Sequence, residues 1–62
     1  MKKWNVGDIV HVDGEADQWP HERICDYGEI LQTTQRRLLI ALVGNRETLW
    51  FKKSDCSINI QD

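Results

Sequence analysis

The chain has 62 residues, a formal net charge of −2 and a charged fraction of 29%. This length fits one domain over residues 1–62, whose core is too small to enclose a cofactor cavity as well. The composition excludes a disordered polyelectrolyte and argues against strong nonspecific binding to nucleic acid, which requires a net positive field.

The first regular element is a strand. Residues 8–12 alternate and are β-branched, and they lie between Gly7 and the turn signal Asp13-Gly14. The following residues 13–26 are acidic, contain the single proline and lack a clear period. We therefore expect a long loop after the first strand.

The second half of the chain predicts a series of short strands and turns. Its strands are expected at residues 27–34, 38–43, 48–52 and 57–60, its turns at 34–36 and 44–47, and a single helical turn at Ser54-Asp55. The alternative is one helix over residues 30–43, because several leucines there follow a helical stripe and the composition favours helix. Thr33 and Thr34 in mid-segment, and the lack of an N-terminal cap, argue for the strands.

The order and spacing of these segments resemble the SH3-like small β-barrels, the group that includes the Tudor and KOW domains. The resemblance is carried by residues 7–12 (GDIVHV), 28–31 (GEIL), 41–44 (ALVG) and 49–56 (LWFKKSDC). It implies an all-β fold: a five-stranded small barrel with a long loop after the first strand and a short helical turn before the last. Cys56 stands where that turn usually has an apolar residue.

The two-residue period of a strand predicts which side chains face the core. His11 and Trp50 are expected to point outward. The side chains expected inside are Val10, Val12, Ile30, Leu49 and Phe51.

Three tryptophans among five aromatic residues favour a binding surface, since so small a core holds few indoles. The function we expect is a non-enzymatic protein-binding module, a small accessory or regulatory factor that recognises another protein or peptide through an aromatic groove. The residues expected to bind this partner are Trp19, Tyr27, Trp50, Glu22 and Asp26. The alternative is structural: Trp19 caps one end of the barrel, Trp4 covers the junction of the termini, and the acidic residues form a solvated loop.

Two basic doublets support a different function. Arg36 and Arg37 fall at a hairpin tip, and Lys52 and Lys53 fall at the end of the fourth strand. By the resemblance to KOW domains they would bind nucleic acid or a ribonucleoprotein through phosphate contacts. Solvated turns and an edge strand protected by lysine are the structural alternative.

Metal binding and catalysis have little support. His21 and Cys25 are one possible pair of zinc ligands, and His11 and Cys56 could supply the other two. Zinc sites, however, usually show two closely spaced ligand pairs in the sequence. No orienting group, oxyanion donor set or phosphate-binding loop can be identified. We expect no metal, no cofactor and no enzyme activity.

The remaining expectations concern assembly and location. Leu39 or Leu42, if exposed, would form an oligomer interface. The longest apolar run has six residues, whereas a membrane span needs roughly 18. Residues 1–3 (MKK) make a basic start, but the apolar stretch that a signal peptide requires does not follow them. We expect a cytoplasmic protein with reduced cysteines and no membrane partner.

Overall fold

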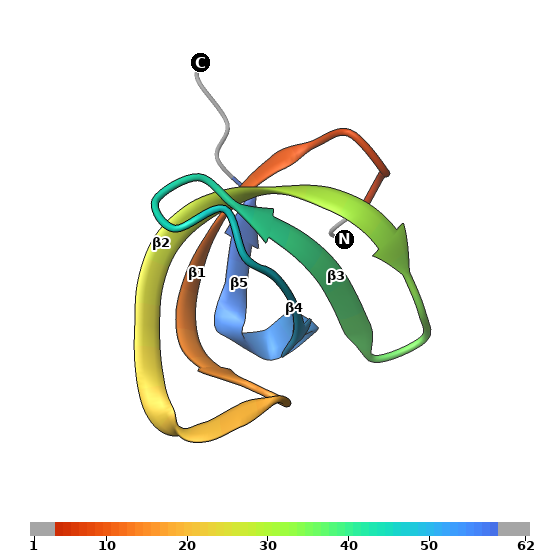
Figure 1. Cartoon of the computed structure of the whole chain (residues 1–62). Coiled ribbons are helices and arrows are strands. Elements are labelled where there is room, and N and C mark those ends of the chain that lie inside the picture. Colours follow the sequence, from red (N-terminus) through yellow and green to blue (C-terminus); the bar gives the residue numbers. More distant parts are fainter. Residues whose placement is uncertain (1–3, 59–62) are drawn as a thin grey trace.

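The structure is a computed structural model that describes residues 4–58, and it is built mainly of β-strands (Figure 1). The strands and the one 3-10 turn are β1 (Ile9–Ala16), β2 (Trp19–Thr33), β3 (Arg37–Leu42), β4 (Thr48–Lys52), η1 (Lys53–Asp55) and β5 (Cys56–Ile58). The expected all-β chain with five strands is confirmed, and a helix over residues 30–43 is excluded. Of the expected last strand, Asn59 and Ile60 lie outside the described residues.

The expected long loop after the first strand is wrong. β1 continues to Ala16, a two-residue turn follows, and β2 begins at Trp19 and runs for 15 residues. The two strands form one long antiparallel hairpin, visible as the orange and yellow ribbons in Figure 1. The acidic stretch is therefore the far end of a curved hairpin.

Gly14 explains why Asp13-Gly14 is not a turn. A Cβ at Gly14 would meet the Asp55 side chain, including its Cβ at 2.8 Å. Glycine is therefore required at this point of β1 because η1 packs against the strand, and not because the chain reverses there.

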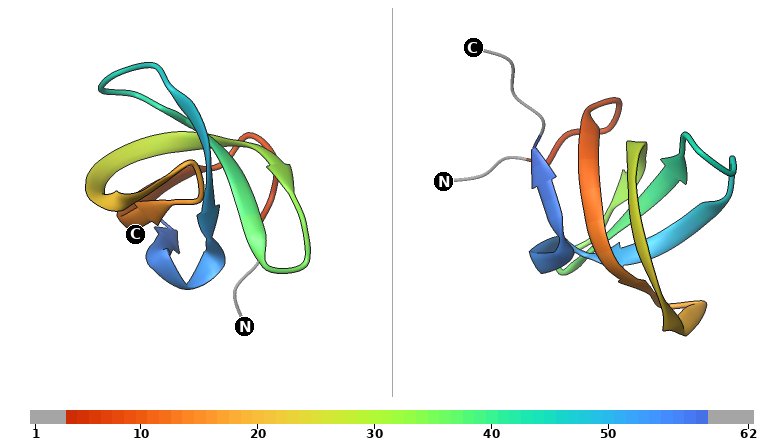
Figure 2. Two further views of the ribbon diagram at one scale, coloured as in Figure 1. Left: turned by 60° about the horizontal axis from the view of Figure 1, so that its bottom comes forward. Right: turned by 90° about the vertical axis from the view of Figure 1, so that its left-hand side faces the viewer.

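The five strands form one antiparallel sheet in the order β2-β3-β4-β1-β5, with an additional pairing of β2 with β1. β1 thus pairs with three strands: with β2 along its whole length, with β5, and with β4 where Ala16 faces Phe51. The pairs β1–β2, β2–β3, β3–β4 and β4–β1 make a closed circuit. Figure 2 shows the strongly curled sheet that results.

The curled sheet encloses the core. The predicted interior side chains Val10, Val12, Ile30, Leu49 and Phe51 are all buried. The remaining buried hydrophobic side chains are Ala16, Leu38, Ile40, Leu42 and Cys56. Burial of one large aliphatic or aromatic side chain contributes about 1.5–3 kcal/mol, so this single cluster carries the fold. Within residues 4–58 we find no helix of sufficient length and apolarity to cross a membrane.

Candidate functional site

The predicted aromatic residues lie on two strands, Trp19 and Tyr27 on β2 and Trp50 on β4. Trp19 is partly buried and packs against the core, as does Trp4. Tyr27 is 47% exposed, and its ring contacts His11 edge-on at a centroid distance of 4.9 Å. Trp19 and Tyr27 lie eight residues apart along the curved strand β2.

The two acidic residues predicted beside the aromatics have different environments. Asp26 accepts a hydrogen bond from the Gly44 N–H (2.9 Å) and another from the Tyr27 N–H (2.7 Å). It joins β2 to the turn after β3, so its carboxylate is already engaged within the chain. Glu22 is exposed beside the irregularity in the β1–β2 pairing.

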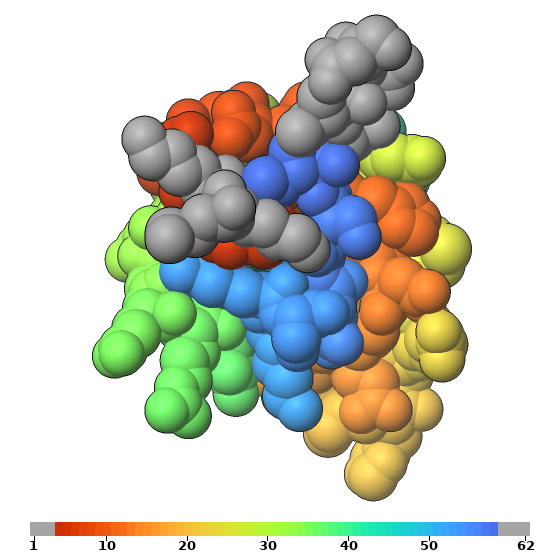
Figure 3. Space-filling view, turned by 180° about the vertical axis from the view of Figure 1, so that it is seen from behind, coloured from red at the N-terminus to blue at the C-terminus, as the bar shows by residue number. Residues whose placement is uncertain are grey.

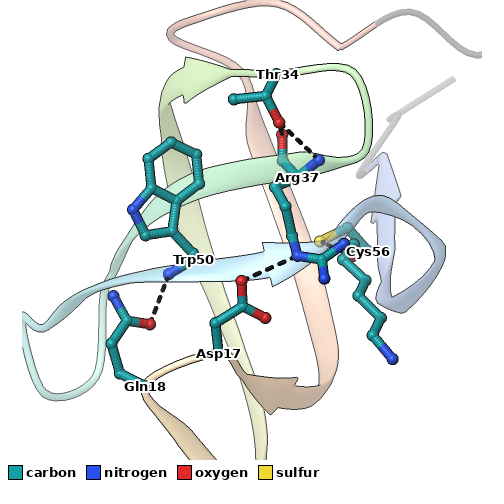
Figure 4. Close-up of polar contacts among 7 residues, drawn as sticks. Asp17, Gln18, Thr34, Arg37, Trp50 and Cys56 are labelled. Carbon is teal, nitrogen blue, oxygen red and sulfur yellow. Dashed lines mark hydrogen bonds and ion pairs between the residues drawn. The ribbon is translucent and has the colours of Figure 1, made fainter.

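Trp50 lies at the middle of β4, half-buried, opposite Leu39 of β3. The turn between β1 and β2 is fastened to its backbone: the Trp50 N–H donates to Gln18 Oε1 (3.2 Å), and the Asp17 N–H donates to the Trp50 carbonyl (2.9 Å). In Figure 4 the indole points away from Gln18. The outward orientation that the sequence predicted for Trp50 follows from its position between the buried Leu49 and Phe51.

The four predicted phosphate-binding residues do come together. A surface pocket of about 490 Å³ lies between the β2–β3 turn and the junction of β4 with η1. It is lined by Gln35, Arg36, Arg37, Lys52, Lys53 and Ser54. We call this the basic pocket. In Figure 3 the green segment of the turn and the light-blue end of β4 project from the same part of the surface.

Backbone contacts fix the two sides of the basic pocket against each other. Arg37 is paired with Lys52 in the β3–β4 register, and the Lys53 N–H donates to the Arg36 carbonyl at 3.0 Å. Thr34 shapes the turn: its Oγ1 accepts from the Arg37 N–H at 3.0 Å (Figure 4). The backbone positions that carry the four basic side chains are therefore fixed relative to one another.

The basic pocket concentrates positive charge. It holds four of the chain's eight lysine and arginine residues, and no acidic residue lines it. Arg37 donates from Nε to Asp17 Oδ2 at 2.9 Å. No carboxylate of residues 4–58 lies within ion-pair distance of Arg36, Lys52 or Lys53. Three cations are thus available to an outside anion.

A second pocket of about 470 Å³ is lined by charges of both signs. Its charged lining includes Asp13, Glu15 and Asp55, together with Arg23 and with Lys52, which borders both pockets. The hydrogen bond from Arg23 lowers the pKa of Asp13 below its usual value of 3.8. Carboxylates and cations therefore line this pocket together, whereas no carboxylate lines the basic pocket.

The histidine and cysteine residues are arranged differently from the sequence-based pairing. Cys25 lies next to His11, not His21, with its Sγ 3.4 Å from His11 Nε2. This contact depends on the β1–β2 register, which a predicted loop could not supply. Cys56 is buried, and no group of three His, Cys, Asp or Glu residues among positions 4–58 could hold a metal ion.

The two leucines of β3 that were expected to form an oligomer interface differ in burial. Leu42 is buried in the core, whereas Leu39 is half-buried opposite Trp50. Of the two leucines, Leu39 alone remains available to a second copy.

Comparison with protein-family models, with curated protein sequences and with solved structures finds no match to the chain.

Proposed function

We propose that the protein binds nucleic acid through the basic pocket, which holds phosphate groups of the backbone. The observation that carries this proposal is the convergence of Arg36, Arg37, Lys52 and Lys53 from two separate segments around one pocket without acidic lining. Of the two sequence-based hypotheses, this one concerns residues that the fold brings together.

Like charges placed together repel one another, so the arrangement needs a reason. Asp17 offsets part of the repulsion through Arg37, and the remaining three cations have no described ion-pair partner. A phosphate between the two sides would relieve the repulsion and accept hydrogen bonds from several donors at once. Arginine suits this role because its planar guanidinium donates two parallel hydrogen bonds.

Trp50 extends the same surface with an aromatic side chain. The pair Leu39–Trp50 follows the pair Arg37–Lys52 on the outward side of β3 and β4. Trp50 and Lys52 are two residues apart on one strand, which is about 7 Å. A basic groove beside an aromatic ring is typical of proteins that bind single-stranded nucleic acid, in which a base stacks on the ring.

The proposal is tested by the affinity for a fluorescently labelled single-stranded oligonucleotide, measured by anisotropy at low salt. Arg36→Gln and Lys53→Gln each remove one unpaired charge from the basic pocket and are expected to weaken binding. Arg46→Gln is the matched control: it removes the same charge from the turn before β4, outside the pocket. Equal effects of all three variants would show that only net charge matters and would contradict a site at the pocket.

A second candidate function, protein binding, is favoured by the face around Tyr27. Ile9 and Val43 are also exposed; the Val43 N–H donates to the Tyr27 carbonyl at 2.9 Å, and Ile9 lies diagonally across the β1–β2 register. Exposed apolar groups on adjacent strands suit a protein partner. Loss of a nuclease-resistant partner on Tyr27→Ala would support this function, and its retention would oppose it.

We also infer that the curled sheet is a small SH3-like barrel. The closed circuit of strand pairs, and the 3-10 turn between β4 and β5, support this assignment. The long β1–β2 hairpin takes the place of the loop that the resemblance implies. An experimental structure in which β1 and β4 are not paired would contradict it.

A further inference from the structure

The outward side of the β1–β2 hairpin carries a thiol and an imidazole in contact. His11 is paired with Tyr27 and Asp13 with Cys25 in the register, so these four side chains share one side of the two strands. Cys25 is exposed, and its Sγ lies 3.4 Å from His11 Nε2. A nucleophile within hydrogen-bond reach of a base is the arrangement that activates cysteine.

The neighbours of this pair hold it in place. The Tyr27 ring contacts the His11 ring edge-on, which limits rotation of the imidazole. On the other side, Arg23 Nη2 lies 2.9 Å from Asp13 Oδ1, so the carboxylate opposite Cys25 is neutralised by a cation. Arg23 Nε also donates to Asp13 Oδ1 at 2.9 Å, and this hydrogen bond raises the pKa of Arg23.

We propose that Cys25 is a thiol–disulfide exchange site, modified by disulfides of small thiols such as glutathione disulfide, and that His11 accepts the thiol proton. In its Nδ1–H tautomer, His11 presents Nε2 to the thiol. As Cys25 Sγ attacks one sulfur of the disulfide, its proton passes to Nε2 and the disulfide bond breaks. The departing thiolate takes the proton back from His11, leaving a mixed disulfide on Cys25 and one free small thiol.

Two features of the chain make the site selective. Cys56 is buried, and its Sγ donates to the Lys52 carbonyl at 3.4 Å, so a disulfide in solution cannot reach it while the chain is folded. Cys25, by contrast, is exposed on the outward side of the hairpin. The site is separate from the basic pocket, since none of its four side chains lines that pocket.

The experiment is the rate of reaction with glutathione disulfide at pH 7, followed by intact-protein mass. Wild type and Cys56→Ser are expected to gain one glutathionyl group, and Cys25→Ser none. His11→Asn and His11→Gln are both expected to lower the rate about tenfold, because an unassisted thiol is only a few per cent thiolate at this pH. His21→Asn, the other histidine of the chain, is the matched control and should leave the rate unchanged.

Three outcomes would overturn the proposal. One is a wild-type rate in both His11 variants, which would make Cys25 an exposed thiol with no activating base. Another is a product in which Cys25 joins two copies of the chain before glutathione is added, which would make it an assembly site. A third is modification of Cys56 first. If a His11 variant gains a second glutathionyl group, the buried Cys56 has reacted and that variant has unfolded. The rate of the other His11 variant then provides the test.

Discussion

The Asp26 carboxylate joins two parts of the chain that are 18 residues apart. It accepts from the Gly44 N–H through Oδ2 and from the Tyr27 N–H through Oδ1. Asp26→Ala removes both acceptors and is expected to lower the free energy of unfolding by about 1–2 kcal/mol. Chemical denaturation measures this loss. Glu22→Ala, which removes the same charge from the same strand, should change stability by less than about 0.5 kcal/mol, and equal effects of the two variants would contradict the role of Asp26.

The ion pair of Asp13 with Arg23 predicts a pH effect. The pKa of Asp13 is lowered by the Arg23 hydrogen bond, so the pair stabilises the fold above pH 3.8 and this contribution is lost as the pH falls through the lowered pKa. Both side chains face solvent, so the effect is small and weakened by salt. Arg23→Gln should raise the pKa of Asp13 toward 3.8, as followed by NMR titration of the carboxyl carbon. Arg46→Gln should leave it unchanged, and a shift of equal size in both variants would contradict a local pairing.

At the scale of residues, the sequence predicted which side chains face the core better than it predicted which residues are in contact. The two-residue period correctly placed Val10, Ile30 and Phe51 in the core. It could not show that Asp26 is engaged by Gly44, or that Cys25 meets His11, because both contacts depend on register and turn geometry. Such contacts join residues distant in the chain, which a local pattern does not encode.

The close approach of β2 to β3 depends on Gly28. A Cβ there would collide with Ile40 Cγ2 and lie 2.7 Å from the Ala41 carbonyl oxygen, a backbone atom that cannot move without breaking the strand pair. Gly28→Ala is therefore expected to destabilise the fold by about 3 kcal/mol. Gly14→Ala should cost less in the same thermal or chemical denaturation series, because its collision is with the Asp55 side chain. A Gly28→Ala protein as stable as wild type would contradict this packing.

The β2–β3 turn links stability to the proposed site. Thr34 Oγ1 accepts from the Arg37 N–H, and the Thr34 N–H donates to the Arg37 carbonyl at 2.9 Å. Thr34→Ala should lower stability by about 1 kcal/mol and also weaken oligonucleotide binding, because Arg36 and Arg37 lose their fixed frame. Thr34→Ser keeps the hydroxyl and should restore both. Loss of binding in Thr34→Ser as well would show that the turn does not act through this hydroxyl.

Among the elements, β4 (Thr48–Lys52) has the expected bounds, and β3 differs by one residue at each end. The turns at 34–36 and 44–47 and the helical turn near Ser54 are also confirmed. The long hairpin was missed because Asp13-Gly14 and Pro20 are ordinary turn signals. In this fold Gly14 instead makes room for Asp55, and Pro20 lies in the irregular start of β2.

For the whole molecule, the pairing of strands decides which residues share a surface. Arg36 and Lys53 are 17 residues apart in the chain, and they border one pocket because β3 and β4 return side by side. The sequence identified the two basic doublets but not their convergence. It grouped the aromatic residues instead, and in the fold Trp19 is partly buried against the core whereas Tyr27 is exposed beside His11.

The central claim is that phosphate groups bind at the basic pocket, and the salt dependence of oligonucleotide affinity tests it most directly. The three pocket cations without an ion pair to any of residues 4–58 predict a slope of about −2 for log K against log salt with a single-stranded oligonucleotide. Arg36→Gln should reduce the steepness, whereas Arg46→Gln should not. A slope near zero in the wild type, or no detectable binding at low salt, would contradict the account.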